Sequence, residues 1–178
     1  GALRAVETAV ICVNATAGLE VNTRRTFARA GDAGVGRMVL INKLDHENVD
    51  FSELLDRIQT TFGSACVPLN VPVGNGHNFS AVVSTLKVPS EIPKDVQPDP
   101  TDLNKTAMDA IVEADEELMM RYLEGEELGP EEIASGVTKA IAAGTLIPVF
   151  CASSKTGVGV PEFLDALAAY GVPPALVP

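Results

Sequence analysis

Three continuous apolar runs of strand length lie along the chain, at residues 8–14, 37–42 and 145–150. Runs without polar alternation are typical of strands covered on both faces, as in a parallel sheet. A helical stretch at about residues 22–30 separates the first two runs, which predicts a strand–helix–strand unit. Another helix is expected at about residues 50–62, where apolar side chains recur at helical spacing. The pattern therefore predicts an α/β core: a three-stranded parallel sheet with flanking helices.

The middle of the chain has a different pattern. Residues 65–73 and 79–88 look like strands joined by a glycine-rich turn. A proline-rich connector follows, then a long amphipathic helix at about residues 102–123 and a further helix that opens at Gly129-Pro130. We therefore expect two parts: residues 1–63 and 145–178 form the α/β core, and residues 64–144 form an inserted α+β subdomain.

Composition narrows the classes of function. The net charge is -11, with 24 acidic against 13 basic residues. Such a chain repels phosphate backbones, so direct nucleic-acid binding is not expected, whereas a basic partner protein would be favoured. No stretch reaches the roughly 18 apolar residues that a membrane span needs, so no membrane association is expected.

The three cysteines, Cys12, Cys66 and Cys151, are far apart in apolar runs. An odd, widely spaced set argues against a disulfide framework or a zinc site. We interpret them as buried thiols in a reducing compartment, which predicts a cytoplasmic protein. The chain begins Gly1-Ala2-Leu3 without an initiator methionine, so a processed or cut product is expected.

The first candidate site follows the strand at residues 37–42, where the sequence reads Asn42-Lys43-Leu44-Asp45. Ligands of open parallel sheets bind at the carboxyl ends of the strands. A carboxylate at Asp45 can accept hydrogen bonds from N1–H and the 2-amino group of guanine, a donor pair that adenine lacks. Asn42 can donate to N7 or tie neighbouring loops together, and the Lys43 stem can lie on the ring face. The competing interpretation is a polar turn after a strand.

A second loop strengthens the base-binding interpretation. Ser153-Ser154-Lys155 follows the strand at residues 145–150. The Ser153 hydroxyl could brace Asp45, and the backbone N–H of Ser154 could donate to guanine O6. The alternative is a small-residue loop that caps the next helix. Two such loops at the ends of two parallel strands indicate a guanine-base site more strongly than either loop does.

The sequence does not predict phosphate recognition by this chain. Residues 31–36 have the G-x4-G spacing of a phosphate loop, but Arg37 and Met38 occupy its Lys and Ser/Thr positions, and methionine cannot ligand magnesium. The segment also precedes a strand, so we interpret it as a helix-to-strand turn. His46 and His77 have no evident metal or catalytic partner in the sequence. The expected cofactor is GTP or GDP held through the base, with Mg²⁺ and hydrolysis beyond what this chain supplies.

Segments outside the two loops carry a family resemblance. They are residues 2–9, 71–74, 79–83, 122–127, 147–151 and 163–167. With residues 42–45, they resemble the GTPase domain of bacterial elongation factor G, from just after its second switch region. In that family residues 64–144 would correspond to the G′ insertion. The resemblance implies a parent protein that hydrolyses GTP during ribosomal translocation, with the ribosome and its stalk protein as partners. Two features depart from the family pattern: Ser154, and the short segment between Leu86 and Asp102. The sequence is therefore as consistent with a paralogue of elongation factor G as with the main translocase.

Three hypotheses follow from the sequence. The first is a fragment of a translational GTPase that supplies guanine recognition but binds GTP weakly. The second is a non-catalytic interaction module that docks a ribosomal or other protein through the G′ part. The third is an unrelated α/β enzyme with a coincidental motif. Because the phosphate-loop strand of GTPases lies beside the strand at residues 8–14, the first hypothesis also predicts an exposed edge or self-association there.

Overall fold

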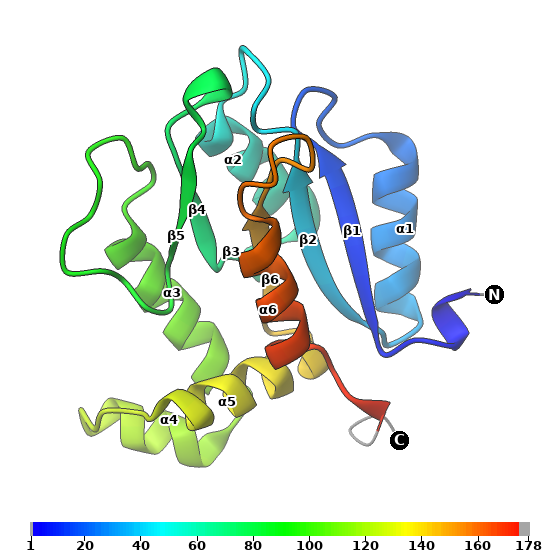
Figure 1. Cartoon of the computed structure of the whole chain (residues 1–178). Coiled ribbons are helices and arrows are strands. Elements are labelled where there is room, and N and C mark those ends of the chain that lie inside the picture. The colour runs from blue at the N-terminus through cyan, green and yellow to red at the C-terminus, as the bar shows by residue number, and fades with distance from the viewer. Residues whose placement is uncertain (1, 175–178) are drawn as a thin grey trace.

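A four-stranded parallel sheet organises the protein (Figure 1). The computed structural model describes residues 2–174. The sheet has the strand order β1-β2-β6-β3. Three strands were expected; the fourth is β3, which pairs with β6 at the edge of the sheet. The strands are β1 (Thr8–Asn14), β2 (Gly36–Asn42), β6 (Ile147–Cys151) and β3 (Cys66–Pro68).

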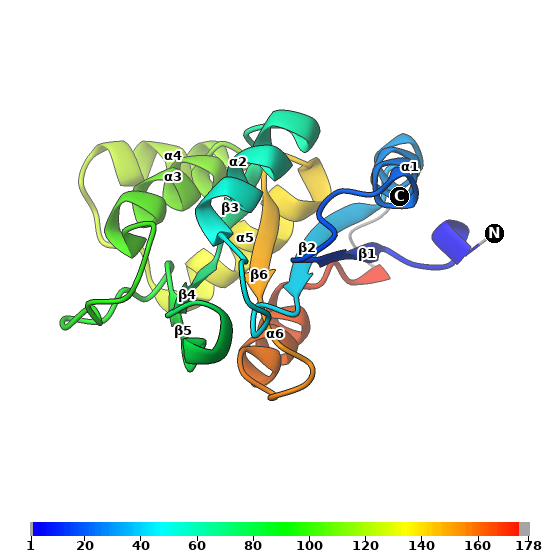
Figure 2. The same ribbon diagram turned by 90° about the horizontal axis from the view of Figure 1, so that it is seen from above.

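Helices cover both faces of this sheet. Helices α1 (Val21–Asp32) and α2 (Phe51–Phe62) lie on one face, and α6 (Val160–Tyr170) lies on the other (Figure 2). Helices α3 (Pro100–Val112) and α5 (Pro130–Ala143) contribute to the same hydrophobic cluster as α6. The predicted α/β class with flanking helices is therefore confirmed.

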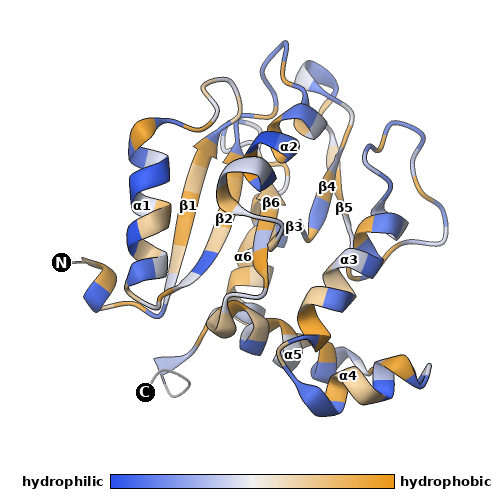
Figure 3. Ribbon diagram, turned by 180° about the vertical axis from the view of Figure 1, so that it is seen from behind, coloured by the Kyte–Doolittle hydropathy of each residue, from blue (hydrophilic) through white to orange (hydrophobic). Residues whose placement is uncertain are grey.

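Strand β2 shows why its sequence is apolar without alternation. Val39 and Ile41 belong to the hydrophobic cluster beneath α1 and α2, whereas Met38 belongs to the cluster beneath α5 and α6. All three side chains are fully buried. Each face of β2 thus needs apolar residues, as expected for a strand inside a doubly covered parallel sheet. The apolar colouring of the strands is visible in Figure 3.

The segment at residues 65–73 divides between two sheets, although one strand was expected. β3 joins the main sheet, and β4 (Asn70–Val73) forms an antiparallel hairpin with β5 (Ala81–Ser84). The break falls at Leu69, whose N–H donates to Val149 O on β6 while its carbonyl accepts from Thr85 N. Leu69 therefore bonds both to β6 of the main sheet and to the residue that directly follows β5 of the hairpin. Helix η2 (Gly76–Asn78) lies between β4 and β5, and η1 (Ala2–Arg4) precedes β1.

The expected long helix at residues 102–123 is two helices, α3 and α4 (Glu116–Leu123). The Asp115 carboxylate accepts hydrogen bonds from the N–H groups of Glu117 and Leu118, at 3.1 and 3.3 Å. An aspartate side chain that satisfies the free N–H groups of a first turn is a strong helix start. The apolar periodicity continued through this capping residue, which is why the sequence pattern missed the break.

The residues of the expected insertion share their packing with the rest of the protein. Val71 and Val83 of the hairpin lie in one cluster with Ile11 of β1. Ile111 of α3 lies in the other cluster with Phe150 of β6. The division at residues 64–144 stays a prediction, and its two parts are in extensive apolar contact.

Strand β1 lies at the edge of the main sheet, where it pairs with β2 among the described residues. The exposed edge expected at residues 8–14 is present, and self-association through it stays a prediction. Cys12 was expected to be buried and is exposed. Its face of β1 is less covered than the face of Ile11 and Val13, which packs beneath α1 and α2.

Gly136 of α5 allows α3, α4 and α5 to pack closely. A Cβ atom there would lie 2.7 Å from Ile111 Cγ2 and 3.1 Å from Leu118 Cδ1. Overpacking a filled core costs about 1–3 kcal/mol, more than the gain in helix propensity of up to about 1 kcal/mol. We expect Gly136→Ala to lower the free energy of unfolding, measured by urea denaturation. The matched change Gly31→Ala meets only the guanidinium end of Arg37 and should not destabilise; equal losses would contradict this account.

Candidate functional site

The parallel pairing of β2 with β6 brings the two predicted loops to one edge of the sheet. Ile41 pairs with Cys151, so the residues that follow each strand emerge side by side. The loops are then linked by backbone hydrogen bonds from Ala152 N to Ile41 O and from Leu44 N to Ala152 O. The structure thus gathers the six predicted residues: Asn42, Lys43, Asp45, Ser153, Ser154 and Lys155.

Asp45 is the buried anion of this site, with 7% of its surface exposed. The Ser153 hydroxyl donates to Asp45 Oδ1 at 2.7 Å, the contact suggested from the sequence. This hydrogen bond is the main reason why the pKa of Asp45 lies below its ordinary value; burial opposes the shift, and His46 and Lys155 add to it. Asp45 is therefore an ionised acceptor at neutral pH.

Asn42 ties the two loops together, one of the two roles suggested for it. Its Oδ1 accepts from Ser154 N at 2.9 Å, and its Nδ2 donates to Ser154 Oγ at 3.1 Å. The same Oδ1 accepts from Lys43 N. The N–H of Ser154 was expected to be available for a base oxygen, but in this structure it donates to Asn42, because the neighbouring loop supplies a carbonyl within reach.

Two lysines flank the buried carboxylate. Lys43 is exposed and has a left-handed φ of 70°, which turns the chain sharply after β2. Lys155 Nζ lies 3.9 Å from Asp45 Oδ2, and the Lys155 side chain is 78% exposed. Because the Lys155 ammonium is exposed to solvent and lies at the outer limit of an ion-pair distance, Lys155 can move off the buried carboxylate at small cost.

Residues that the sequence interpretation missed shape the second loop. Thr156 N donates to Ser153 Oγ at 3.2 Å, so the hydroxyl that holds Asp45 is itself oriented. Ser153 N donates to Val158 O. Gly159 has a φ of 76°, and a Cβ atom there would lie 2.1 Å from Cys151 O. The closely spaced Gly157 and Gly159 were the available signal in the sequence for this tight turn.

The glycine-rich segment at residues 31–36 is a helix-to-strand turn, as predicted. It connects the end of α1 to the start of β2, and Gly34 has a left-handed φ of 68°. Val35 N donates back to Ala30 O, which closes the helix end.

Neither a metal-ligand cluster nor a membrane-spanning helix occurs among residues 2–174. Within that range no group of three or more His, Cys, Asp or Glu side chains is arranged to hold a metal ion. No helix in the described part of the chain combines the length and apolar character needed to cross a membrane. The exposed His77 Nε2 lies 3.0 Å from Glu47 Oε1, which is a contact between two surface side chains.

The crystal structure of a protein from Thermus thermophilus has the same fold. The architecture is that of a GTPase domain with an antiparallel insertion. That protein superposes with a TM-score of 0.85 at 29% identity, over 98% of this chain and 28% of the other. An elongation factor G-like protein of Thermotoga maritima is 33% identical over 97% of this chain and 26% of its own length. The chain thus spans about a quarter of these two relatives.

The family itself is given by a match over most of the sequence. The elongation factor Tu GTP-binding domain family matches residues 1–173. The chain belongs to this family, a domain of translational GTPases. The expected class, a GTP-binding domain of a translation factor, is therefore confirmed, and the base contacts of individual residues stay predictions.

The hydrogen bond from Ser153 to Asp45 should stabilise the fold in a pH-dependent way. Because the folded pKa of Asp45 is lowered, its stabilisation is present above the unfolded pKa of about 3.9 and is lost as pH falls through the folded value. We expect Ser153→Ala to cost about 1–2 kcal/mol of unfolding free energy at pH 7, and the difference from the wild type to narrow below about pH 4.

Chemical denaturation at several pH values measures this effect. Ser154→Ala is the matched control, because Ser154 is exposed and its hydroxyl accepts only from Asn42. The control should have a small and pH-independent effect. A loss for Ser153→Ala that stayed constant down to pH 3 would show that Asp45 is not the group stabilised.

Proposed function

We propose that this chain recognises the guanine base of GTP or GDP, with Asp45 as the residue that selects it. The observation that carries the proposal is a buried, ionised carboxylate held in place between two loops at the carboxyl ends of adjacent strands. A fixed acceptor of this kind matches the two neighbouring N–H donors on one edge of guanine. Membership of a GTP-binding domain family supports the same ligand.

The remaining residues have complementary roles in this proposal. Ser153 fixes one carboxylate oxygen, and the hydrogen bonds of Asn42 keep the two loops at a constant separation. The Lys43 stem covers one face of the base. Lys155 swings from Asp45 when the base enters, and its stem covers the other face. An acceptor that is already oriented loses little entropy on binding, which favours specificity.

The parent activity is proposed to be that of a translational GTPase of the elongation factor G type acting on the ribosome in the cytoplasm. The similarity to the elongation factor G-like protein of Thermotoga maritima supports this, as does the inserted hairpin with its helices. The two base loops, residues 42–45 and 153–155, would select the base. Phosphate binding is not assigned to this chain, because no G-x4-G-K-[ST] motif occurs in the 178 residues. We therefore assign this chain base selection rather than phosphate chemistry.

The Asp45→Asn variant tests base selection. Xanthine carries a carbonyl where guanine carries the 2-amino group, and the new amide can donate to that carbonyl. Hydrogen bonds to a charged group contribute about 1.5–3 kcal/mol each, so we expect the preference for GDP over xanthosine diphosphate to fall by about tenfold or more. Titrations followed by backbone amide shifts are suitable, because binding by this chain should be weaker than micromolar.

Asp50→Asn is the matched control for this test. Asp50 caps α2 through Glu53 N, and asparagine caps equally well, so neither fold nor base preference should change. The proposal predicts shifts in both base loops with GDP at millimolar concentration. An unchanged preference in Asp45→Asn, or no shifts in either loop, would refute it.

A second function, docking of the ribosomal stalk protein, is favoured by the surface of α4. Met120 and Leu123 are one helical turn apart and are 62% and 77% exposed. Exposed acidic residues surround them, among them Glu116 and Glu124. An apolar pair with an acidic rim suits a partner with apolar anchors and basic flanks.

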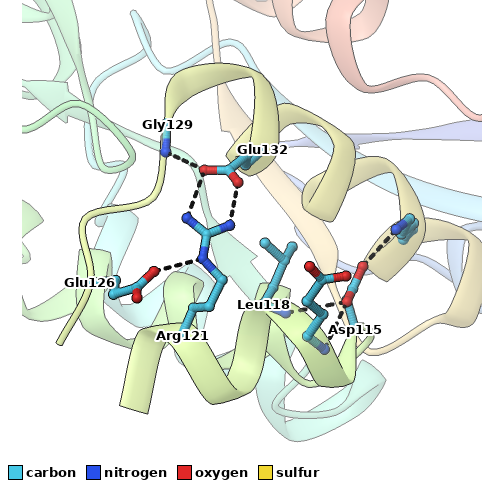
Figure 4. Close-up of polar contacts among 8 residues, drawn as sticks. Asp115, Leu118, Arg121, Glu126, Gly129 and Glu132 are labelled. Atoms are coloured by element: carbon cyan, nitrogen blue, oxygen red, sulfur yellow. Dashed lines mark hydrogen bonds and ion pairs between the residues drawn. The ribbon is translucent and has the colours of Figure 1, made fainter. Parts of the chain in front are cut away.

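A polar network holds α4 against α5 and so presents this surface (Figure 4). Arg121 donates to Glu126 at 2.8 Å and to Glu132 on the next helix. Glu132 also accepts from Gly129 N at 2.8 Å, at the start of α5. Lys139 pairs with Asp115, the residue that caps α4. Both ends of α4 are therefore fixed to α5, while its outer face is free to bind.

Met120→Ser with Leu123→Ser should weaken binding of purified stalk protein by about tenfold or more, because exposed apolar anchors dominate such contacts. Isothermal titration calorimetry measures the affinity. The double change Val21→Ser with Leu164→Ser removes two exposed apolar side chains elsewhere and serves as the control. Equal weakening in both variants would exclude α4 as the docking surface.

A further inference from the structure

The charge of this protein is distributed very unevenly. Residues 64–144 contain five Lys and Arg against fourteen Asp and Glu, a net charge of -9 that accounts for most of the total of -11. Residues 1–37 contain five arginines against three acidic residues, a net charge of +2. Helices α1 and α4 lie at opposite ends of the molecule in all three overall views (Figures 1–3). The protein therefore has a basic end and an acidic end.

The basic end is built on one face of α1. Arg24, Arg25 and Arg29 are exposed, whereas Phe27 and Ala30 are buried against the sheet. At about 100° per residue the three arginines span roughly 140° of the helix circumference, opposite the buried stripe. The helical period that places Phe27 in the core thus places all three guanidinium groups in solvent. We call Arg24, Arg25 and Arg29 the arginine face.

The arginine face has no acidic partner within the described residues. None of its three side chains forms an ion pair there, in contrast with Arg121, which pairs with two glutamates. Asp32, at the end of α1, is the one acidic residue of that helix. Three unpaired guanidinium groups on about 7.5 Å of helix form a locally positive surface, at a density of charge that matches several phosphates of a duplex.

We propose that the arginine face binds the phosphate backbone of double-helical RNA. Guanidinium groups bind phosphate oxygens with two parallel hydrogen bonds, and such contacts need no base sequence. The acidic end does not prevent this, because charges separated by more than about 8–10 Å are largely screened at physiological salt. The choice of RNA over other polyanions rests on the proposed function, since a protein that works on the ribosome meets an RNA surface.

Net charge alone does not decide binding at one surface, and the expectation that this chain does not bind nucleic acid stays a prediction. A total of -11 predicted repulsion from nucleic acid, but binding at a surface depends on the potential within a Debye length of that surface. Phosphate-directed arginines also orient a domain without specifying sequence. The arginine face would then fix how the domain lies on RNA while the base loops, which lie at the ends of β2 and β6, remain free.

The test measures binding of the whole chain to a fluorescently labelled RNA duplex of about 20 base pairs, longer than the span that a small duplex-binding domain covers. Fluorescence anisotropy gives the dissociation constant at several salt concentrations. Three phosphate contacts predict a slope of about -2 to -3 for log K against log salt, so affinity should fall by roughly 16- to 64-fold between 50 and 200 mM salt. The triple change Arg24→Gln, Arg25→Gln, Arg29→Gln should weaken binding by about tenfold or more and reduce the slope towards zero.

Two matched variants separate the arginine face from overall charge. Lys87→Gln, Lys94→Gln, Lys105→Gln removes three exposed lysines from the insertion and changes the net charge equally. It should leave RNA affinity within about twofold, because those charges lie outside the contact. Arg24→Lys, Arg25→Lys, Arg29→Lys keeps the charge and should retain most of the salt dependence while it loses the bidentate contacts. Thermal melts identify any variant that is misfolded.

The results distinguish binding through the arginine face from binding through overall charge. Equal losses in the arginine and lysine triple variants, or equally tight binding to poly-glutamate as to RNA, would overturn the proposal. Failure of the proposed base selection would be seen separately: Asp45→Asn should keep RNA binding, and the arginine triple variant should keep its amide shifts with GDP. RNA binding that survives the loss of all three arginines refutes the arginine face without bearing on Asp45.

Discussion

The register between β2 and β6 is the constraint on which the site depends. Residues 42 and 153 are more than one hundred positions apart, yet parallel pairing of Ile41 with Cys151 ends both strands at the same level. The loops can then exchange hydrogen bonds through Asn42 and Ser154. A slip of one residue would reverse the faces of β6, a strand buried throughout, and would separate these partners. Burial of the strands therefore positions the polar loops.

One oxygen of the Asp45 carboxylate is held by a hydrogen bond from within the protein. The carboxylate of Asp45 accepts from Ser153, whose hydroxyl accepts in turn from Thr156 N. This chain of donors keeps a charged group stable at low exposure, where an unpaired carboxylate would be costly. It also fixes the direction of the remaining acceptor positions. The same hydrogen bonds therefore stabilise the loops and would orient Asp45 for the proposed base contact.

The segment of residues 64–144 adds surfaces rather than chemistry. Its hairpin and helices share apolar clusters with the core, so it is rigidly supported, and its exposed side chains give the molecule an acidic end. Helix α1 supplies a basic end on the opposite side. Because salt screens each region from the other, one small protein can present surfaces of opposite charge to different partners. The net charge of the whole chain does not describe the charge of either surface.

The sequence by itself determined the class of fold and placed two polar loops, the candidate base loops, at the ends of adjacent strands. Apolar runs at β1, β2 and β6 predict a doubly covered parallel sheet because burial on both faces demands them. Only tertiary structure decided where Leu69 divides one apolar run between two sheets, and how Asp115 starts a new helix inside a continuous apolar pattern. The tertiary structure also decided that the N–H of Ser154 donates to Asn42 Oδ1. Periodicity reports which faces are buried, whereas hydrogen-bond partners distant in sequence depend on the register of the folded strands.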